Sequence, residues 1–252
     1  MNEDKFNNIA EIYEKYRPSY PEEYINYIIE KCNLNSESLV ADIGAGTGIL
    51  TRQLLNRNLK VVGVEPNNDM RNILKKLELN KRFKAIEGKA ENTNLEDNSI
   101  DLIVVAQAFH WFDSERFRNE CKRILKTNGK VCIMWNKLDM NSEIVKEQKK
   151  IDDKYEKRYT EVNNLLDDTK RELKIKEFFE NSYYERRIVE NNLINDKEKF
   201  IGSNLSKSYS LRKGDEFYDD YIRDFENVFN KYSQDGIVII PNNTYGYLGE
   251  IS

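Results

Sequence analysis

The chain has 252 residues, which suits one domain with an elaboration and argues against a large second catalytic domain. Its 40 Lys and Arg residues against 44 Asp and Glu give a formal net charge of -4, without a block of like charge. This balance argues against nucleic acid as a partner, because such binding rests mainly on cationic contacts to phosphate. Three cysteines and the single histidine, His110, assemble neither a zinc site nor a disulfide framework. We therefore expect no metal and reduced thiols.

The first segment, residues 1–38, carries no apolar core of a signal peptide, and it is predicted to contain a lid and a helix. The helix begins at Pro21 and places Tyr24, Ile25, Ile28 and Ile29 on one face. The longest aliphatic run of the chain, residues 102–106, is far short of the roughly 20 residues that span a bilayer. We therefore expect a cytoplasmic protein without a membrane partner.

From residue 39 to 136, short β-branched runs alternate with helical patterns, as in βαβ units of a mostly parallel sheet. The predicted strands cover residues 39–43, 60–64, 83–87, 100–105 and 130–135. The predicted helices between them cover residues 49–57, 69–78 and 114–125, and Asn128-Gly129 is predicted to cap the last one. This segment is the expected ligand-binding α/β core.

The composition changes after the fifth strand, where a charged helical pattern carries a stripe of Ile151, Tyr155, Tyr159, Val162 and Leu166. Two more strands are predicted at residues 182–190 and 237–249, with a helix at 218–232 between them. We therefore expect a doubly wound, mostly parallel seven-stranded α/β fold. Residues 137–235 form its helical insertion and sixth strand, which cover the substrate, and residues 236–252 supply the strand that completes the sheet.

The strongest motif is the glycine loop that follows the first strand. Asp42 stands at the strand tip, and Gly44, Gly46 and Gly48 alternate with other residues before a helix begins. Glycine is needed where a turn uses positive φ and where a ligand approaches the main chain. In the dinucleotide fingerprint the third glycine comes one residue later, at the position of Ile49. A nicotinamide-dependent oxidoreductase remains an alternative, but this spacing argues against it.

Three further segments follow strand ends. Glu65 ends the second strand, where a carboxylate can accept hydrogen bonds from both hydroxyls of a ribose. Ala90 and Glu91 follow the third strand, where a small residue can lie against an adenine ring and an acid can accept from its amino group. Residues 107–112 form an aromatic cluster after the fourth strand, at the edge where open α/β sheets bind ligands.

In these motifs the chain resembles the class I S-adenosylmethionine-dependent methyltransferases, over roughly residues 6 to 136. The resemblance implies the cofactor S-adenosylmethionine and assigns each contact to a matching position. The implied cofactor residues are Asp42, Gly44, Ala45 and Gly46 at the methionine part, Glu65 with Pro66 at the ribose, Met70, Ala90 and Glu91 at the adenine, and Gln107 and Ala108 near the sulfonium. A non-catalytic protein that binds S-adenosylmethionine is a second alternative.

The opening at residues 6–21 is similar to that of the branch that includes trans-aconitate methyltransferases, as is the Ala-Phe-His-Trp-Phe run at 108–112. Within the opening, Arg17 is suited to pair with the cofactor's carboxylate, because a guanidinium matches a carboxylate geometrically. Its alternative is an exposed arginine ahead of a helix. The branch implies a small-molecule methyl acceptor, and the expected pocket residues are Tyr13, Tyr16, Tyr20, His110 and Trp111.

Methyl transfer from a sulfonium needs little beyond positioning and exclusion of water. A carboxylate acceptor needs no deprotonation, whereas a hydroxyl or ammonium acceptor needs a base. His110 is the candidate base, with a structural place in the aromatic cluster as its alternative. Residues 107–110 lack the Pro-Pro motif of nucleobase amino-methyltransferases, and Cys121 and Cys132 lack the setting of a cytosine-methylating nucleophile. No motif specifies the acceptor or the oligomeric state.

Overall fold

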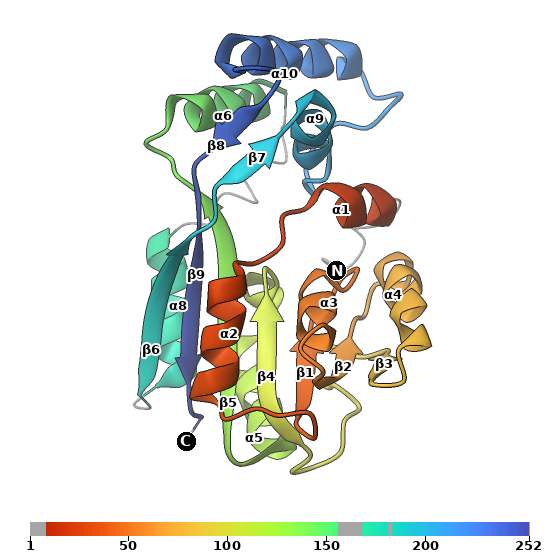
Figure 1. Cartoon of the computed structure of the whole chain (residues 1–252), viewed down its shortest axis with the longest axis vertical. Coiled ribbons are helices and arrows are strands. Elements are labelled where there is room, and N and C mark those ends of the chain that lie inside the picture. The colour runs from red at the N-terminus through yellow and green to blue at the C-terminus, as the bar shows by residue number, and fades with distance from the viewer. Residues whose placement is uncertain (1–8, 156–167, 181–182, 252) are drawn as a thin grey trace.

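The computed structural model describes residues 9–155, 168–180 and 183–251, and its centre is a seven-stranded sheet (Figure 1). The strand order is β3-β2-β1-β4-β5-β9-β6, and β9 runs antiparallel to both of its neighbours while the other pairs are parallel. The strands are β1 (Leu39–Ile43), β2 (Lys60–Val64), β3 (Phe83–Ile86), β4 (Ile100–Ala106), β5 (Leu125–Leu138), β6 (Tyr184–Glu190) and β9 (Asn242–Gly249). The predicted doubly wound, mostly parallel sheet is confirmed.

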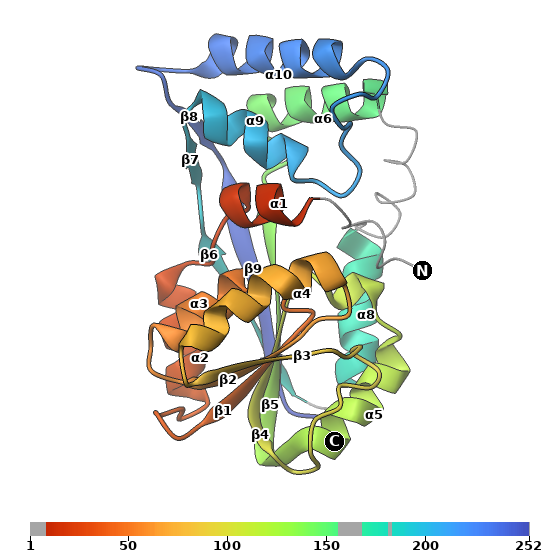
Figure 2. The same ribbon diagram turned by 90° about the vertical axis from the view of Figure 1, so that its right-hand side faces the viewer.

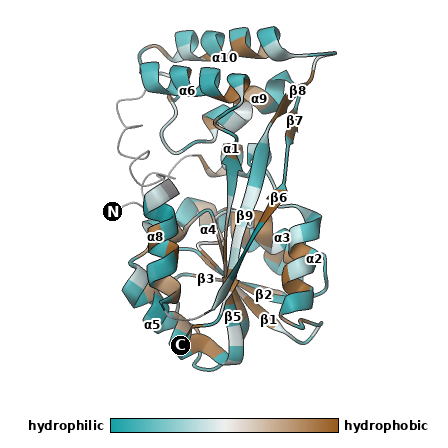
Figure 3. Cartoon of the chain, turned by 90° about the vertical axis from the view of Figure 1, so that its left-hand side faces the viewer, coloured by the Kyte–Doolittle hydropathy of each residue, from teal (hydrophilic) through white to brown (hydrophobic). Residues whose placement is uncertain are grey.

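Helices cover both faces of this sheet, which explains why its central strands are apolar on both sides. One face carries α2 (Glu22–Lys31), α3 (Ile49–Leu55) and α4 (Asn68–Leu74), which continues into the 3-10 turn η2 (Lys75–Leu79). The other face carries α5 (Ser114–Ile124) and α8 (Asp168–Phe179). In β4, Leu102 to Val105 are fully buried, and each such side chain contributes about 1.5–3 kcal/mol relative to exposure. Figure 3 shows the same division, with hydrophobic central strands and hydrophilic outer helix faces.

A second group of elements, here called the cap, lies above the carboxyl ends of the parallel strands (Figures 1 and 2). It consists of α6 (Glu143–Tyr155), β7 (Leu193–Asn195), α9 (Lys197–Leu205), α10 (Tyr218–Tyr232) and β8 (Val238–Ile240). The cap has its own apolar cluster, which includes Phe200, Tyr221 and Phe225. A buried ion pair of Lys207 with Asp152, at 2.5 Å, ties its segments together.

Helix α1 (Ala10–Tyr16) lies between the cap and the core (Figure 2). Ile9 and Ala10 pack in one cluster with Met70 of α4, on the side of the core. On the side of the cap, the hydroxyl of Tyr16 donates to Glu198 of α9 at 2.8 Å. Helix α1 therefore contacts both groups of elements.

Two predicted details are wrong. Helix α5 ends at Ile124, and Asn128, with φ of +67°, lies in β5 where the register with β4 shifts, so Asn128-Gly129 bends a strand and caps no helix. The predicted strand at 237–249 is two strands, because β8 pairs with β7 in the cap and β9 joins the main sheet after Pro241. The predicted stripe residues Tyr159, Val162 and Leu166 lie outside the described residues.

Candidate functional site

The glycine loop after β1 turns against the loop after β4. Gly44 has a φ of +70°, and a Cβ atom built on it would lie 2.7 Å from the Cβ of Ala108. Gly46 has a φ of +59°, and a Cβ atom there would meet no described atom within 4 Å. Gly44 is therefore required by a close approach of two loops, whereas Gly46 leaves bare main chain facing open space.

Glu65 is held against this loop from the end of β2. Its two carboxylate oxygens accept hydrogen bonds from the N–H groups of Gly46 and Asn67, each at 2.8 Å. The side chain is buried, and burial raises the pKa of Glu65 to about 7 although both N–H groups act to lower it. The carboxylate is thus fixed in place, and its remaining lone pairs can accept from a ligand's hydroxyl groups.

Asp42 lies behind the loop and is also buried. Its Oδ2 accepts from the hydroxyl of Thr51 at 2.6 Å, and its Oδ1 has no hydrogen-bond partner among the described residues. Burial raises the pKa of Asp42 to about 6, while the bonds from Thr51 act to lower it. A buried acceptor without a donor is costly, so Asp42 is held behind the loop at a cost in stability.

The loops after β1, β2, β3 and β4 enclose a cavity of about 380 Å³, a size typical of small-molecule sites. Most of the predicted cofactor residues line it. These are Gly44, Gly46, Glu65, Pro66, Met70, Ala90, Glu91, Gln107 and Ala108. Parallel strands deliver their ends to one edge of the sheet, which is why residues so far apart in the chain meet here.

Three predicted cofactor residues do not line the cavity. Asp42 and Ala45 lie on the inner side of the glycine loop, where Ala45 packs against the cluster around α2 and α3. The guanidinium of Arg17 donates to the carbonyl oxygen of Ser206 in the cap at 3.1 Å and stacks over the ring of Tyr13. The predicted pairing of Arg17 with a ligand carboxylate stays a prediction.

The predicted acceptor residues divide in the same way. Tyr13 and Trp111 line the cavity. Tyr16 packs its ring over Gly202 of α9, and Tyr20 is 5% exposed within the core, so neither reaches the cavity. Four lining residues were not assigned to the site from the sequence, and they are Asn67, Lys89, Ala106 and Phe112. Asn67 could have been noticed in the sequence, because an Asn directly before a helix is a typical N-cap. In the structure its side chain accepts a hydrogen bond from the N–H of Met70 at the start of α4.

The turn after β4 contains the 3-10 turn η3 (Phe109–Trp111) and is fixed from two sides. Gln107 has a φ of +62° and donates its N–H to the carbonyl of Met134 at 2.9 Å. From α8, the ammonium of Lys174 donates to the carbonyl oxygens of Phe109, His110 and Phe112. Side chains on this turn are therefore presented to the cavity in a defined orientation.

His110 lies on the side of this turn that does not line the cavity. Burial, together with the positive charges of Arg171 and Lys174, lowers the pKa of His110 to about 3. Its Nδ1 is buried and has no hydrogen-bond partner among the described residues. A histidine that is neutral at pH 7 and binds a proton so weakly is a poor general base, which favours the structural alternative.

Two absences apply to the described part of the chain. Within residues 9–155, 168–180 and 183–251, His, Cys, Asp and Glu side chains form no group of three or more that could hold a metal ion. In the same ranges, no helix has the length and apolar character needed to cross a membrane.

Comparison with known sequences gives a match between residues 41–133 and the family described as "Methyltransferase domain". An uncharacterized methyltransferase of Mycobacterium tuberculosis is 39% identical over 134 residues, which are 53% of this chain and 53% of that protein. An uncharacterized methyltransferase-like protein of Schizosaccharomyces pombe is 34% identical over 146 residues, 58% of this chain and 56% of that protein. The match thus spans about half the length of these curated relatives.

Solved structures resemble the chain over most of its length. The YcgJ protein from Bacillus subtilis aligns with a TM-score of 0.57 at 16% identity, covering 91% of this chain and 98% of that one. A Haemonchus contortus phosphoethanolamine N-methyltransferase, solved with S-adenosylhomocysteine, aligns with a TM-score of 0.56 at 17% identity, covering 98% of this chain and 58% of that one. Residues 41–133 are thus a methyltransferase domain, and the chain has the fold of the class I S-adenosylmethionine-dependent methyltransferases.

Proposed function

We propose that this protein is an S-adenosylmethionine-dependent methyltransferase that methylates a carboxylate group of a small molecule. The observation that carries the proposal is the position of Glu65, whose buried carboxylate is fixed by two N–H groups at the wall of the 380 Å³ cavity. A carboxylate held in this way is suited to the paired hydroxyls of a ribose.

The other lining residues fit the rest of this cofactor. Gly46 offers bare main chain to its methionine part, while Met70 and Ala90 offer apolar surface to its adenine. Gln107 and Ala108 follow the end of β4. When bound, S-adenosylmethionine supplies a methyl group on a sulfonium, which is already a good leaving group. The residues of the cavity then have to orient the two reactants and exclude water.

The choice of a carboxylate acceptor rests on the weakness of His110 and the engagement of Glu65 as bases among the described residues. The pKa of His110 is lowered to about 3, and Glu65 is engaged by Gly46 and Asn67. A hydroxyl or ammonium acceptor needs a proton to be removed at neutral pH, whereas a carboxylate is already a nucleophile. The similarity of residues 6–21 to the trans-aconitate branch supports the same class.

The test compares matched acceptors in the presence of isotopically labelled S-adenosylmethionine. Small carboxylic acids are incubated beside their amides and alcohols, and the products are analysed by mass spectrometry. We expect labelled methyl esters, which hydrolyse in base, from the acids alone. Binding of NAD without binding of S-adenosylmethionine would refute the methyltransferase assignment, and cofactor binding without transfer to any acceptor would indicate a non-catalytic binding protein.

A further inference from the structure

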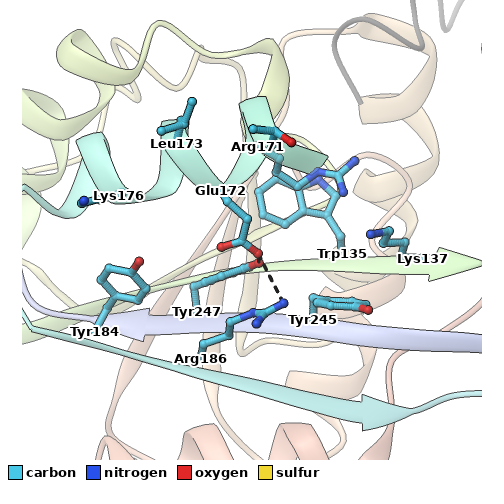
Figure 4. A pocket seen from close by; sticks show the side chains of 11 residues that line it. Trp135, Lys137, Arg171, Glu172, Leu173, Lys176, Tyr184, Arg186, Tyr245 and Tyr247 are labelled. Atoms are coloured by element: carbon cyan, nitrogen blue, oxygen red, sulfur yellow. Dashed lines mark hydrogen bonds and ion pairs between the residues drawn. The ribbon is translucent and has the colours of Figure 1, made fainter. Parts of the chain in front are cut away.

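A second cavity, of about 530 Å³, lies between α8 and the strands β5, β9 and β6 (Figure 4). None of its lining residues lines the cavity that contains Glu65. It is on the face of the sheet that α5 and α8 cover, and the chemistry proposed above does not use it.

The walls carry aromatic rings from three strands. Trp135 comes from β5, Tyr245 and Tyr247 come from β9, and Tyr184 comes from β6. Side chains two residues apart on a strand point to the same face, so Tyr245 and Tyr247 both present their rings here. Trp135 is 2% exposed, and its buried Nε1 has no hydrogen-bond partner among the described residues. The cavity thus combines ring surfaces with a buried donor that lacks an acceptor.

The charges around these rings are strongly unequal. Among the described residues that line the cavity, one is a carboxylate, Glu172, and four are cationic, namely Lys137, Arg171, Lys176 and Arg186. Glu172 already accepts from the hydroxyl of Tyr247 and pairs with Arg186 at 3.4 Å. By side-chain type, the described lining is thus richer in cations than in carboxylates, a composition that favours an anionic ligand over a cationic one.

The cations also stand over the rings. The guanidinium of Arg171 lies 5.1 Å from the centroid of Trp135, and the ammonium of Lys137 lies 5.1 Å from that of Tyr245. The guanidinium of Arg186 lies 5.5 Å from the same Tyr245 ring. The cations thus lie against the aromatic wall, so a flat anion that enters the cavity meets guanidinium groups beside the rings, and the guanidinium fork matches a carboxylate.

We propose that this cavity is a second ligand site, separate from the cofactor cavity, which binds a planar organic anion of the aromatic carboxylate class. A neutral analogue of the same shape loses the interaction with the four cations, and an aliphatic anion loses the stacking on the rings.

The two tryptophans of the chain allow each cavity to be observed by itself, since Trp111 lines the cofactor cavity and Trp135 lines the second one. In the full-length Trp111→Phe variant, tryptophan emission comes from Trp135 alone. The protein is titrated with benzoate and, as a matched neutral control, with benzamide, and calorimetry repeats both titrations on the unmodified protein. We expect a saturable change of Trp135 emission and a binding isotherm with benzoate, and neither with benzamide.

Two substitutions then test the assignment of the charges. Arg186→Gln and Lys137→Gln should each raise the dissociation constant for benzoate at least tenfold, whereas Lys231→Gln, at an exposed ion pair of the cap, should leave it unchanged. The far-ultraviolet circular dichroism of each variant shows whether it is folded. Absence of saturable benzoate binding, equal binding of benzamide, or wild-type affinity in both cavity variants would each overturn the proposal. Because no readout depends on methyl transfer, the result is independent of the proposed function.

Discussion

The carboxylate of Glu65 accepts a hydrogen bond from Gly46 of the glycine loop and also lines the cavity. We expect Glu65→Ala to weaken binding of S-adenosylhomocysteine by about 1–3 kcal/mol, because ribose hydroxyls lose a charged acceptor. Titration calorimetry measures this change. The exposed Glu96→Ala is the matched control and should keep the wild-type dissociation constant. An unchanged affinity in Glu65→Ala would remove this residue from the site.

The pKa of Glu65, raised from 4.5 to about 7, predicts that the free energy of unfolding and the affinity for the cofactor change in opposite directions with pH. The folded protein holds this proton more tightly than the unfolded chain, so the free energy of unfolding should fall as the pH rises from about 4.5 to about 7. Affinity for the cofactor should change in the other direction, because hydroxyl groups donate to the ionised form. Melting curves and calorimetry between about pH 5 and about pH 8 measure both trends.

The variant Glu65→Gln is the control for this pH dependence. It should lose the change in affinity and keep a part of the stability trend, since the pKa of Asp42 is also raised, to about 6. If the affinity of the wild-type protein were constant over this pH range, ionised Glu65 would not be the acceptor.

His110 offers a prediction of small effect. The loss of a general base costs about 10²- to 10⁴-fold in rate. A histidine with a pKa near 3 is a weak base, so its loss should not cause a decrease of this size. We expect His110→Asn to retain turnover within about tenfold, with an unchanged pH profile. A larger loss, together with the disappearance of an inflection in the wild-type profile, would restore His110 as the base.

At the scale of elements, the glycine loop requires both its backbone angle and its proximity to the loop after β4. Gly44 and Gly236 have similar φ angles, +70° and +76°, but only Gly44 has a neighbour within 4 Å of the added Cβ, at 2.7 Å. The left-handed angle costs about 1–2 kcal/mol in either variant. We expect Gly44→Ala to lower the melting temperature more than Gly236→Ala and to weaken cofactor binding, which Gly236→Ala should leave intact. Equal effects on both properties would show that the contact with Ala108 does not matter.

The elements that the sequence predicted well are those with local causes. Strands β1 and β2 begin and end where their β-branched runs do, and each is followed by the residue that serves the cavity. The wrong details have distant causes. Asn128-Gly129 has the local pattern of a helix cap, but pairing with β4 draws it into a strand. Residues 237–249 divide at Pro241 because β8 pairs with β7 in the cap, whereas β9 joins the main sheet.

The same distinction explains the site. Glu65 and Ala90 could be predicted because each follows a strand end, and the ends of parallel strands meet at one edge, whereas Met70 was implied by the family resemblance. Arg17 and Tyr16 could not be placed, because their partners Ser206 and Glu198 are more than 180 residues away in the chain. No pattern within residues 6–21 contains that information. The position of the cap decides where these side chains lie.

At the scale of the whole molecule, the seven-stranded sheet carries a cap with its own apolar cluster, and α1 contacts both. Tyr13 of α1 lines the cofactor cavity, while Tyr16 and Lys15 of the same helix bond to Glu198 of the cap. A ligand that contacts Tyr13 and Met70 therefore stabilises the helix to which the cap is attached. We therefore expect cofactor binding to favour closure of the cap over the acceptor.

Hydrogen exchange with and without S-adenosylhomocysteine tests this expectation. We expect peptides from residues 9–20 and from α9 to become more protected on binding, because α1 gains contacts on its cavity side and holds α9 through Glu198. Strands β1 and β4 should change little, since they are buried and stable without ligand. Glu198→Ala removes the bonds from Tyr16 and Lys15, so it should abolish the added protection of α9 and keep that of α1. The matched control is Glu226→Ala, which breaks an ion pair within the cap, between α10 and Lys197, and should preserve both effects. If residues 9–20 exchanged equally fast in both states, α1 would be a fixed part of the core, and closure of the cap would need another cause.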